Sequence, residues 1–168
     1  VHLSERALRK RLDIPKFVQP YAFINVEGKE ETSAGRSFMN VAEAQHIERM
    51  LCYLKDNLDI DLVKHVGIIA FYKGQVDHLQ KQLRHKFGDI KIQTVDSFQG
   101  SENDIIIISF VRSNENQKVG FLKDFRRLNV ALTRAKLSLI MFGHANTLSG
   151  MKDIKHLVQD AEARGCFF

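Results

Sequence analysis

Cysteine is scarce in this sequence, which has two cysteines among 168 residues, Cys52 in a helical pattern and Cys166 near the end. Such a pair provides neither a disulfide framework nor the spacing of a zinc site, so we expect a reducing compartment, nuclear or cytoplasmic. The seven histidines are scattered, and His78, His85 and His156 fall in helical stretches without paired ligand spacing. We therefore predict no metal site in this chain.

Long apolar runs are missing as well, and no stretch has the length needed to cross a membrane. The first residues, VHLSERALRKRLDIP, carry charges where a secretion signal would have its apolar core, so we expect a soluble protein without such a signal. Three enzyme motifs are also absent: the phosphate loop G-x-x-x-x-G-K-[ST], a G-x-G-x-x-G after a strand, and the nucleophile elbow G-x-S-x-G. The chain alone therefore cannot be a complete nucleotidase of the phosphate-loop class.

The composition that is present suits one globular domain. Apolar residues make up 44% of the chain and charged residues 27%, which allows a sizeable core. The formal net charge of +5 favours contact with polyanions such as nucleic acids, although charge informs about partners rather than about fold.

Short β-rich runs alternate with longer stretches of helical period. We expect strands at residues 21–26, 66–70, 90–95, 104–110 and 137–143. We expect helices at residues 40–56, between the second strand and Gly88, at 123–136 and in the C-terminal remainder, and a polar loop at 27–37. Apolar strands that alternate with helices indicate an α/β fold with a parallel sheet covered on both faces.

Two local rules add detail to this outline. Asn40 is the expected N-cap of its helix, and Glu43, three residues later, completes a capping-box pattern. In an open parallel sheet, ligands bind beyond the carboxyl ends of the strands. This rule selects the segments after Ala70, Val95, Phe110 and Gly143.

The segment TVDSFQGSE, which begins at Thr94, joins two predicted strands. Asp96 or Ser97 can cap a short helical turn, and Gly100 can adopt a backbone angle closed to other residues. Glu102 is suited to accept hydrogen bonds from sugar hydroxyls, while Thr94 and Ser97 offer hydroxyls to a phosphate. On spacing alone, a loop whose polar side chains satisfy its own backbone is the favoured interpretation.

The segment FRRLNVALTRAK has helical period. Arg127 and Arg134 are seven residues apart, so on a helix they would lie almost on one line beside an apolar stripe. That position suits arginines directed into a cleft. The pattern alone favours an exposed basic helix edge paired with acids such as Asp124.

The segment AFYKGQ ends one strand and begins a helix. A helix N-terminus at the ligand end of a strand offers free N–H groups to a phosphate, and Tyr72, Lys73 and Gln75 could add contacts. An ordinary turn with an exposed lysine explains the pattern equally well.

Three segments taken in this order resemble motifs IV, V and VI of superfamily 1 helicases, of the kind that includes senataxin and the helicase of nonsense-mediated decay. They are GIIAFYKGQ, TVDSFQGSENDIIIISFVR and GFLKDFRRLNVALTRAK, and the flanking FMNVAEA, GHANTL and LVQDAEARG are similar to the senataxin branch. The resemblance runs from about residue 20 to the C-terminus. It implies the second RecA-like domain of a two-domain motor, a three-layer sandwich with a mainly parallel β-sheet flanked by helices, and leaves residues 1–19 as a basic connecting segment.

The resemblance also implies roles for single residues. ATP would bind between this domain and a first RecA-like domain, which would carry the phosphate loop and the Mg ligands. Arg134 matches the arginine finger, and Arg127 would support it or bridge to neighbouring acids. Glu102 matches the residue that contacts the ribose, and Gln99 and Gly100 would shape the turn before it.

On the nucleic-acid side, the resemblance implies contacts to the backbone of single-stranded RNA or DNA by Thr94, Ser97, Tyr72 and Lys73. Gln75, at the N-terminus of the same predicted helix as Lys73, is expected to join them. Phe71 departs from the family pattern, where proline is common, and Ser101 stands where a larger residue is frequent. The expected activity is ATP-dependent helicase activity of a monomeric protein, with this domain inactive by itself. The competing hypothesis is a non-catalytic module that keeps the fold to bind nucleic acid or protein.

Overall fold

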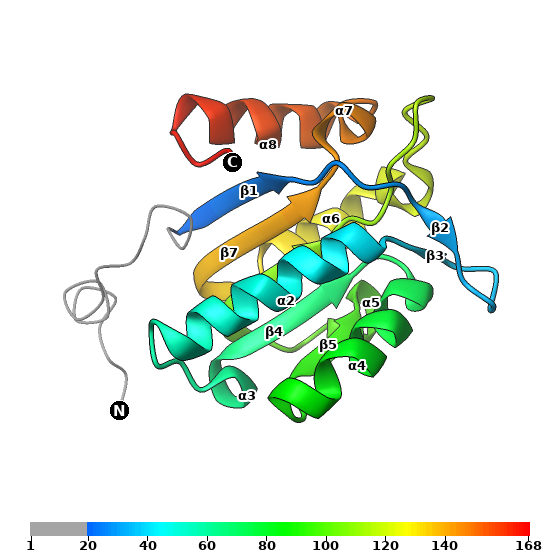
Figure 1. The fold of residues 1–168 in the computed structure, drawn as a ribbon. Coiled ribbons are helices and arrows are strands. Elements are labelled where there is room, and N and C mark those ends of the chain that lie inside the picture. Colours follow the sequence, from blue (N-terminus) through cyan, green and yellow to red (C-terminus); the bar gives the residue numbers. More distant parts are fainter. Residues whose placement is uncertain (1–19) are drawn as a thin grey trace.

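The structure is a computed structural model that describes residues 20–168, so the predicted connecting segment 1–19 lies outside the described residues (Figure 1). Its centre is a five-stranded sheet in the order β1-β7-β6-β4-β5, and every neighbouring pair of strands is parallel. The strands are β1 (Tyr21–Asn25), β4 (Val66–Ala70), β5 (Lys91–Thr94), β6 (Asn103–Ser109) and β7 (Ala135–Gly143). The five predicted strands and the parallel sheet are confirmed, with ends that shift by at most two residues.

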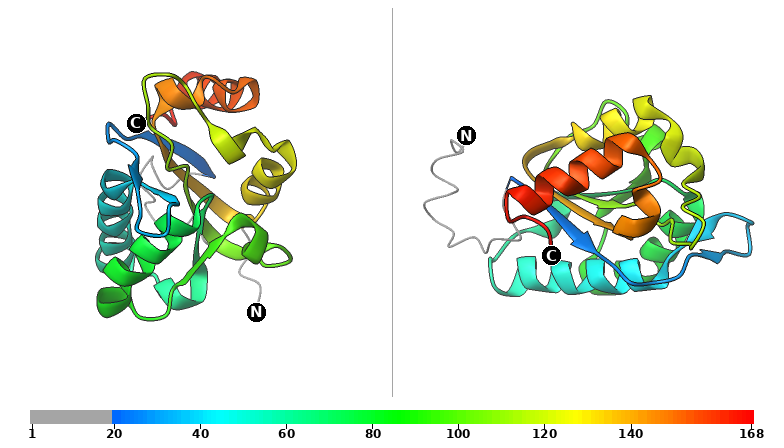
Figure 2. Two further views of the ribbon diagram at one scale, coloured as in Figure 1. Left: turned by 90° about the vertical axis from the view of Figure 1, so that its right-hand side faces the viewer. Right: turned by 90° about the horizontal axis from the view of Figure 1, so that it is seen from above.

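Helices cover both faces of the sheet (Figures 1 and 2). One face carries α2 (Val41–Asp56), α3 (Leu62–His65) and α4 (Lys73–Phe87). The other carries α5 (Val95–Phe98), the 3-10 helix η2 (Gly120–Lys123), α6 (Phe125–Leu132), α7 (Ala145–Leu148) and α8 (Lys152–Ala163). The expected α/β sandwich of three layers is therefore confirmed.

The isoleucine block of β6 lies at the centre of this sandwich. Ile105 and Ile107 pack into the cluster under α2 and α4, whereas Ile106 and Ile108 pack into the cluster on the opposite face. All four are buried, and full burial of such a side chain contributes about 1.5–3 kcal/mol. The strand is apolar throughout because both of its faces are covered.

The polar stretch predicted as a loop contains a short hairpin. Strand β2 (Glu31–Thr32) pairs antiparallel with β3 (Phe38–Met39), and the hairpin projects beside α4 in Figure 1. Phe38 anchors it, since its ring meets the Tyr72 ring edge-on at a centroid distance of 5.5 Å. Two-residue strands carry no alternation of apolar and polar residues, so the sequence pattern did not indicate this hairpin.

The helix predicted over 123–136 is shorter in the structure. Helix α6 ends at Leu132, and the hydroxyl of Thr133 donates to a backbone carbonyl one turn earlier at 2.9 Å. Arg134 therefore lies after the helix. The prediction that Arg127 and Arg134 share one line along a helix is wrong, because a helix end and the start of β7 separate them.

Candidate nucleotide and nucleic-acid site

The turn after β5 begins with α5, whose N-cap is Thr94. The prediction that Asp96 or Ser97 caps this helical turn is therefore wrong. The hydroxyl oxygen of Thr94 accepts from the Ser97 backbone N–H at 3.3 Å, and the same hydroxyl donates to the Ser97 hydroxyl at 3.1 Å. Buried Val95 and Phe98 anchor the turn on the sheet. Two of the hydroxyls predicted to contact nucleic acid therefore lie side by side at the carboxyl end of β5.

The second half of this turn is open to solvent. Gly100 has a φ of 79°, a left-handed conformation that favours glycine, as predicted. Gln99, Gly100 and Glu102 are exposed. The carboxylate of Glu102 has no hydrogen-bond or ion-pair partner within residues 20–168, so it remains available as an acceptor.

Arg134 occupies the short link between α6 and β7. Its Nε donates to the Val130 carbonyl at 3.1 Å, and one terminal nitrogen donates to the Thr133 hydroxyl at 3.1 Å. The side chain is partly buried. The five N–H donors of a guanidinium group exceed these two bonds, so donors remain for a ligand.

The structure brings Glu102 and Arg134 together through the backbone. Asn103 and Ala135 are register partners at the amino ends of β6 and β7, and the Asn103 N–H donates to the Arg134 carbonyl at 3.3 Å. Glu102 immediately precedes Asn103, and Arg134 immediately precedes Ala135. The rule of the carboxyl ends is therefore wrong for this pair, which lies at the amino-terminal edge of the sheet.

We predicted that Arg127 and Arg134 lie on one line along a helix and point to the same place. In the structure, the Arg127 side chain contacts acidic residues instead. Its Nε donates to Asp96 Oδ1 at 3.1 Å and its Nη2 lies 3.1 Å from Asp96 Oδ2, while Asp124 is farther away at 3.9 Å. This two-pronged ion pair joins α6 to α5. Of the two predicted roles for Arg127, bridging to neighbouring acids is what the geometry shows.

Tyr72 is buried rather than presented to a ligand. Its side chain is 4% exposed, and its hydroxyl accepts from Arg112 Nη1 at 3.2 Å and from the Phe121 N–H at 3.3 Å. The predicted direct contact of Tyr72 with nucleic acid is contradicted by this position. The residue instead connects the end of β4 to η2.

Gln75 is also internal, at 0% exposure. Its amide oxygen accepts from the Asn40 N–H at 2.8 Å, and its Nε2 donates to the Asn40 carbonyl and to the Ser109 hydroxyl. A side chain with these bonds has no free group for nucleic acid, so that prediction is wrong. Lys73 is exposed and pairs with Asp77 one helical turn away.

The N-terminus of α4 is covered instead of open. The Gly74 N–H donates to the Ser37 hydroxyl at 3.0 Å, so the β2–β3 hairpin satisfies part of the helix end that one of the two interpretations left open to a phosphate. The ordinary turn with an exposed lysine is the better description of AFYKGQ.

A buried ionic cluster at the carboxyl ends of the strands was not predicted. Arg112 forms a two-pronged pair with Glu30, with Nε 2.8 Å and Nη2 3.2 Å from the two carboxylate oxygens. Burial would raise the pKa of Glu30, but hydrogen bonds from Arg112, Asn114 and the Ser113 N–H outweigh it and hold the pKa below its ordinary value. Arg112 stands alone after a buried strand, and nothing in the sequence around it indicates that Glu30, far away in the chain, is its partner.

A second missed network surrounds Glu43. This residue is 0% exposed and does not reach back to the helix cap as the capping box would require. Its carboxyl group accepts instead from the Ser109 hydroxyl at 2.5 Å and from the Val111 N–H at 3.0 Å. Val111 has a φ of 73°, an unusual conformation for a β-branched residue, and these bonds help to hold it.

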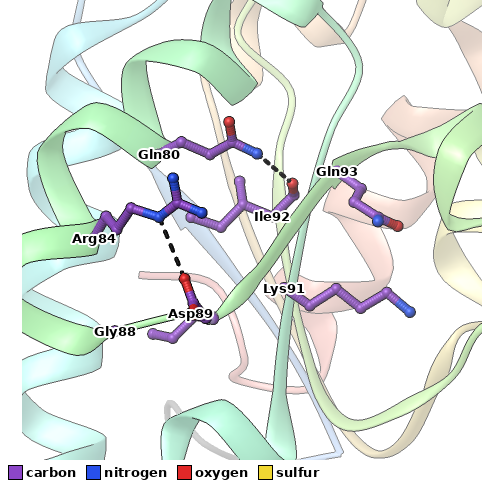
Figure 3. A pocket seen from close by; sticks show the side chains of 8 residues that line it. Gln80, Arg84, Gly88, Asp89, Lys91, Ile92 and Gln93 are labelled. Carbon is purple, nitrogen blue, oxygen red and sulfur yellow. Dashed lines mark hydrogen bonds and ion pairs between the residues drawn. The ribbon is translucent and has the colours of Figure 1, made fainter.

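A pocket of about 280 Å³ lies elsewhere, between the second half of α4 and the edge strand β5 (Figure 3). It is lined by Gln80, Arg84, Gly88, Asp89, Ile90, Lys91, Ile92 and Gln93. Gln80 donates to the Ile92 carbonyl and Arg84 pairs with Asp89. None of the predicted site residues lines this pocket, so it does not bear on their chemistry.

Within residues 20–168, no group of three or more histidine, cysteine, aspartate or glutamate side chains is placed to hold a metal ion. The helices of this part of the chain are all too short or too polar to cross a membrane.

The sequence of this chain matches one protein family and is similar to several known helicases and regulators. Residues 2–146 match the AAA_12 family, described as an AAA domain, so the match includes most of the segment before residue 20. The helicase sen1 of Schizosaccharomyces pombe is 42% identical over 156 residues, which cover 89% of this chain and 9% of that protein. The regulator of nonsense transcripts 1 homologue of Drosophila melanogaster is 39% identical over 164 residues, covering 92% of this chain and 14% of that protein.

The human probable helicase senataxin is 37% identical over 163 residues, which cover 95% of this chain and 6% of senataxin. The chain thus spans less than a sixth of the length of these three relatives. Among solved structures, the C-terminal domain of a possible DNA helicase from Lactobacillus plantarum aligns with a TM-score of 0.48 and 12% identity, over 75% of this chain and 73% of that one.

Proposed function

We propose that this chain, which belongs to the AAA_12 family of senataxin-like superfamily 1 helicases, forms in residues 20–168 the second motor domain of an ATP-dependent RNA or DNA helicase. The observation that carries the proposal is the pairing of Glu102 and Arg134 at one edge of the sheet. The two residues come from separate motifs and meet there through the register of β6 and β7. Both have hydrogen-bonding groups left for a ligand.

In this proposal, the edge with Glu102 and Arg134 faces a nucleotide held mainly by another domain. Glu102 accepts hydrogen bonds from ribose hydroxyls, and Gly100 permits the turn that places it. The unused donors of Arg134 stabilise the negative charge that develops on the transferred phosphoryl group. The phosphate loop and the Mg ligands come from the first RecA-like domain, since this sequence lacks the phosphate-loop motif and its described residues include no cluster placed to hold a metal ion.

The nucleic-acid side of the proposal uses the carboxyl ends of β4 and β5. Lys73 and the hydroxyls of Thr94 and Ser97 contact the backbone of a single strand, whereas Tyr72 and Gln75 support the structure from inside. Such contacts read phosphates rather than bases, so they give little sequence preference and a strong dependence on salt. The Arg127 pair with Asp96 ties this surface to α6, which leads directly to Arg134.

Two further properties complete the proposal. The proposed compartment is a reducing one, the nucleus or the cytoplasm, and the two free cysteines, Cys52 and Cys166, support this part of the proposal. We also propose that the full-length protein works as a monomer, with the first RecA-like domain as the partner that closes the nucleotide site.

The test is the substitution Arg134→Ala in the full-length protein. We expect kcat for ATP hydrolysis to fall by about 10³-fold or more, because a finger arginine acts on charge in the transition state. Nucleotide affinity should change far less. Steady-state ATP turnover gives kcat, and binding of a fluorescent nucleotide gives the affinity.

Arg49→Ala is the matched control, because Arg49 is an exposed arginine on α2, which covers the face of the sheet opposite to α6. It should leave ATP turnover without nucleic acid close to that of the unmodified protein. Normal turnover in the Arg134→Ala protein would show that Arg134 is not the finger.

A further inference from the structure

Two large apolar side chains are exposed where η2 is followed by α6: Phe121 of η2 at 61% and Phe125, the first residue of α6, at 59%. Phe121 is held in place on one side by Tyr72, with ring centroids 5.5 Å apart and a tilt of 34°. On another side, the guanidinium carbon of Arg127 lies 5.7 Å from the centre of the Phe121 ring. No aromatic or cationic contact of this kind holds Phe125 within residues 20–168.

The backbone under Phe121 is fixed as well. Its N–H donates to the buried Tyr72 hydroxyl at 3.3 Å, and Gly120 before it has a φ of 56°. A Cβ on Gly120 would collide with Arg112 Nη1 and the Tyr72 hydroxyl. Leu122 after it is fully buried. Phe121 is thus an exposed ring on a rigid turn, so little entropy would be lost when a flat ligand covers it.

The segment that carries this ring has a net positive charge. Residues 118–127 contain four basic side chains and one acidic side chain. Lys118, Lys123 and Arg126 are exposed, and no carboxylate of the described chain pairs with them. An exposed aromatic ring among unpaired cations is complementary to a single-stranded nucleic acid, whose bases stack on rings and whose phosphates bind cations.

The ring also adjoins the surface already proposed for the nucleic-acid backbone. Arg127, which contacts the Phe121 ring, pairs with Asp96 of α5, and α5 carries Ser97 next to its cap Thr94. A chain of contacts therefore links the ring through Arg127 and Asp96 to the turn that carries the two hydroxyls.

We infer that Phe121 is a stacking platform for one base of a single-stranded nucleic acid, while Lys118, Lys123 and Arg126 bind the phosphates beside it. The inference rests on the proposed nucleic-acid function and adds to it a contact with a base. Stacking on an aromatic ring is tolerant of base identity, so this contact does not create sequence specificity.

The experiment compares two probes with the full 168-residue chain: a short oligouridylate and an oligonucleotide of the same length and charge that lacks bases. Fluorescence anisotropy of labelled probes gives the Kd. Phe121→Ala should weaken binding of the oligouridylate at least about fivefold and leave binding of the abasic probe unchanged. Phe121→Tyr should retain the affinity for both probes, because it keeps the ring.

Phe125→Ala is the matched control, since Phe125 is almost as exposed, lies four residues away, and lacks within residues 20–168 the ring and guanidinium contacts that brace Phe121. We expect no change in oligouridylate affinity. Unchanged oligouridylate binding by the Phe121→Ala chain, or an equal loss with Phe125→Ala, would overturn the platform while leaving the phosphate contacts and Arg134 untouched. A wild-type chain that binds neither probe would overturn both the platform and the nucleic-acid part of the proposed function. The proposed role of Arg134 is decided separately by ATP turnover.

Discussion

Glu43 illustrates at the scale of one residue what the sequence can and cannot predict. The spacing from Asn40 predicted a helix cap, and the Asn40 side chain does accept from the Glu43 N–H at 3.1 Å. The carboxyl group, however, points into the protein and bonds to Ser109 and Val111, which lie more than sixty positions along the chain. Local spacing predicts backbone capping, but it carries no information about which distant donors the fold will bring to a side chain.

The burial of Glu43 leads to a prediction on stability and pH. Burial raises its pKa to about 8, despite the opposing hydrogen bonds from Ser109 and Val111. The unfolded value is about 4.3, so between about pH 5 and pH 8 the folded chain holds a proton that the unfolded chain has lost. Stability from this group is fully present below the unfolded pKa and is lost as the pH rises through the folded pKa.

In the unmodified chain, the free energy of unfolding should fall by up to about 1.4 kcal/mol per pH unit as the pH rises across this range. We expect Glu43→Gln, which imitates the neutral carboxyl group, to remove this fall. The free energy of unfolding by urea, measured across that pH range, provides the test. Glu48→Gln is the control on the same helix, because the pKa of the surface residue Glu48 is lowered by hydrogen bonds from Gln82 and Lys86 and its carboxylate stays ionised. The same slope in Glu43→Gln and the unmodified chain would contradict the assignment.

At the scale of elements, the contact of the β2–β3 hairpin with α4 depends on a glycine. Gly74 is buried in the first turn of α4, and a Cβ there would lie 2.8 Å from the Phe38 carbonyl oxygen and 3.0 Å from that of Ser37. Backbone atoms cannot move aside as the end of a flexible side chain can. The hairpin and the helix can therefore approach this closely only because residue 74 lacks a side chain.

Gly74→Ala should consequently destabilise the protein by about 1–3 kcal/mol through overpacking, although alanine favours helix by about 1 kcal/mol. Gly35→Ala serves as the control, since Gly35 is exposed at the hairpin tip and a Cβ there would meet only Ser33 Oγ, at 3.9 Å. Its change should stay within about 0.5 kcal/mol. The midpoint of thermal unfolding reports both effects, and a Gly74→Ala chain as stable as the unmodified one would refute the close-packing argument.

The elements that were predicted correctly are those with a strong internal pattern. The apolar strand of four isoleucines, the capped helix α2 and the end of α4 at Gly88 each follow from residues next to one another. The end of α6 was missed because FRRLNVALTRAK continues a helical period past the point where Ala135 pairs with Asn103. Sheet pairing is a long-range contact, and it outweighs local periodicity.

The candidate site depends on the same distinction between local and long-range information. Motif resemblance identified Glu102 and Arg134, but their meeting at the amino-terminal edge follows only from the register of β6 and β7. The same resemblance grouped Tyr72 with the ligand contacts, and the position at a helix N-terminus added Gln75, although both side chains are buried. Similarity of motifs indicates which residues matter to a family, and only the packing shows whether a side chain faces a ligand or the core.

At the scale of the whole molecule, the chain carries one side of the proposed nucleotide site and no phosphate loop. The purified 168-residue chain should therefore bind single-stranded nucleic acid without hydrolysing ATP. Its binding should weaken steeply with salt, because phosphate contacts release counterions. ATP turnover with saturating oligouridylate, and anisotropy at several salt concentrations, measure the two properties. Turnover by this chain that disappears in Arg134→Ala would mean that residues 1–168 form a complete site, and would contradict the proposal that a first RecA-like domain supplies the rest.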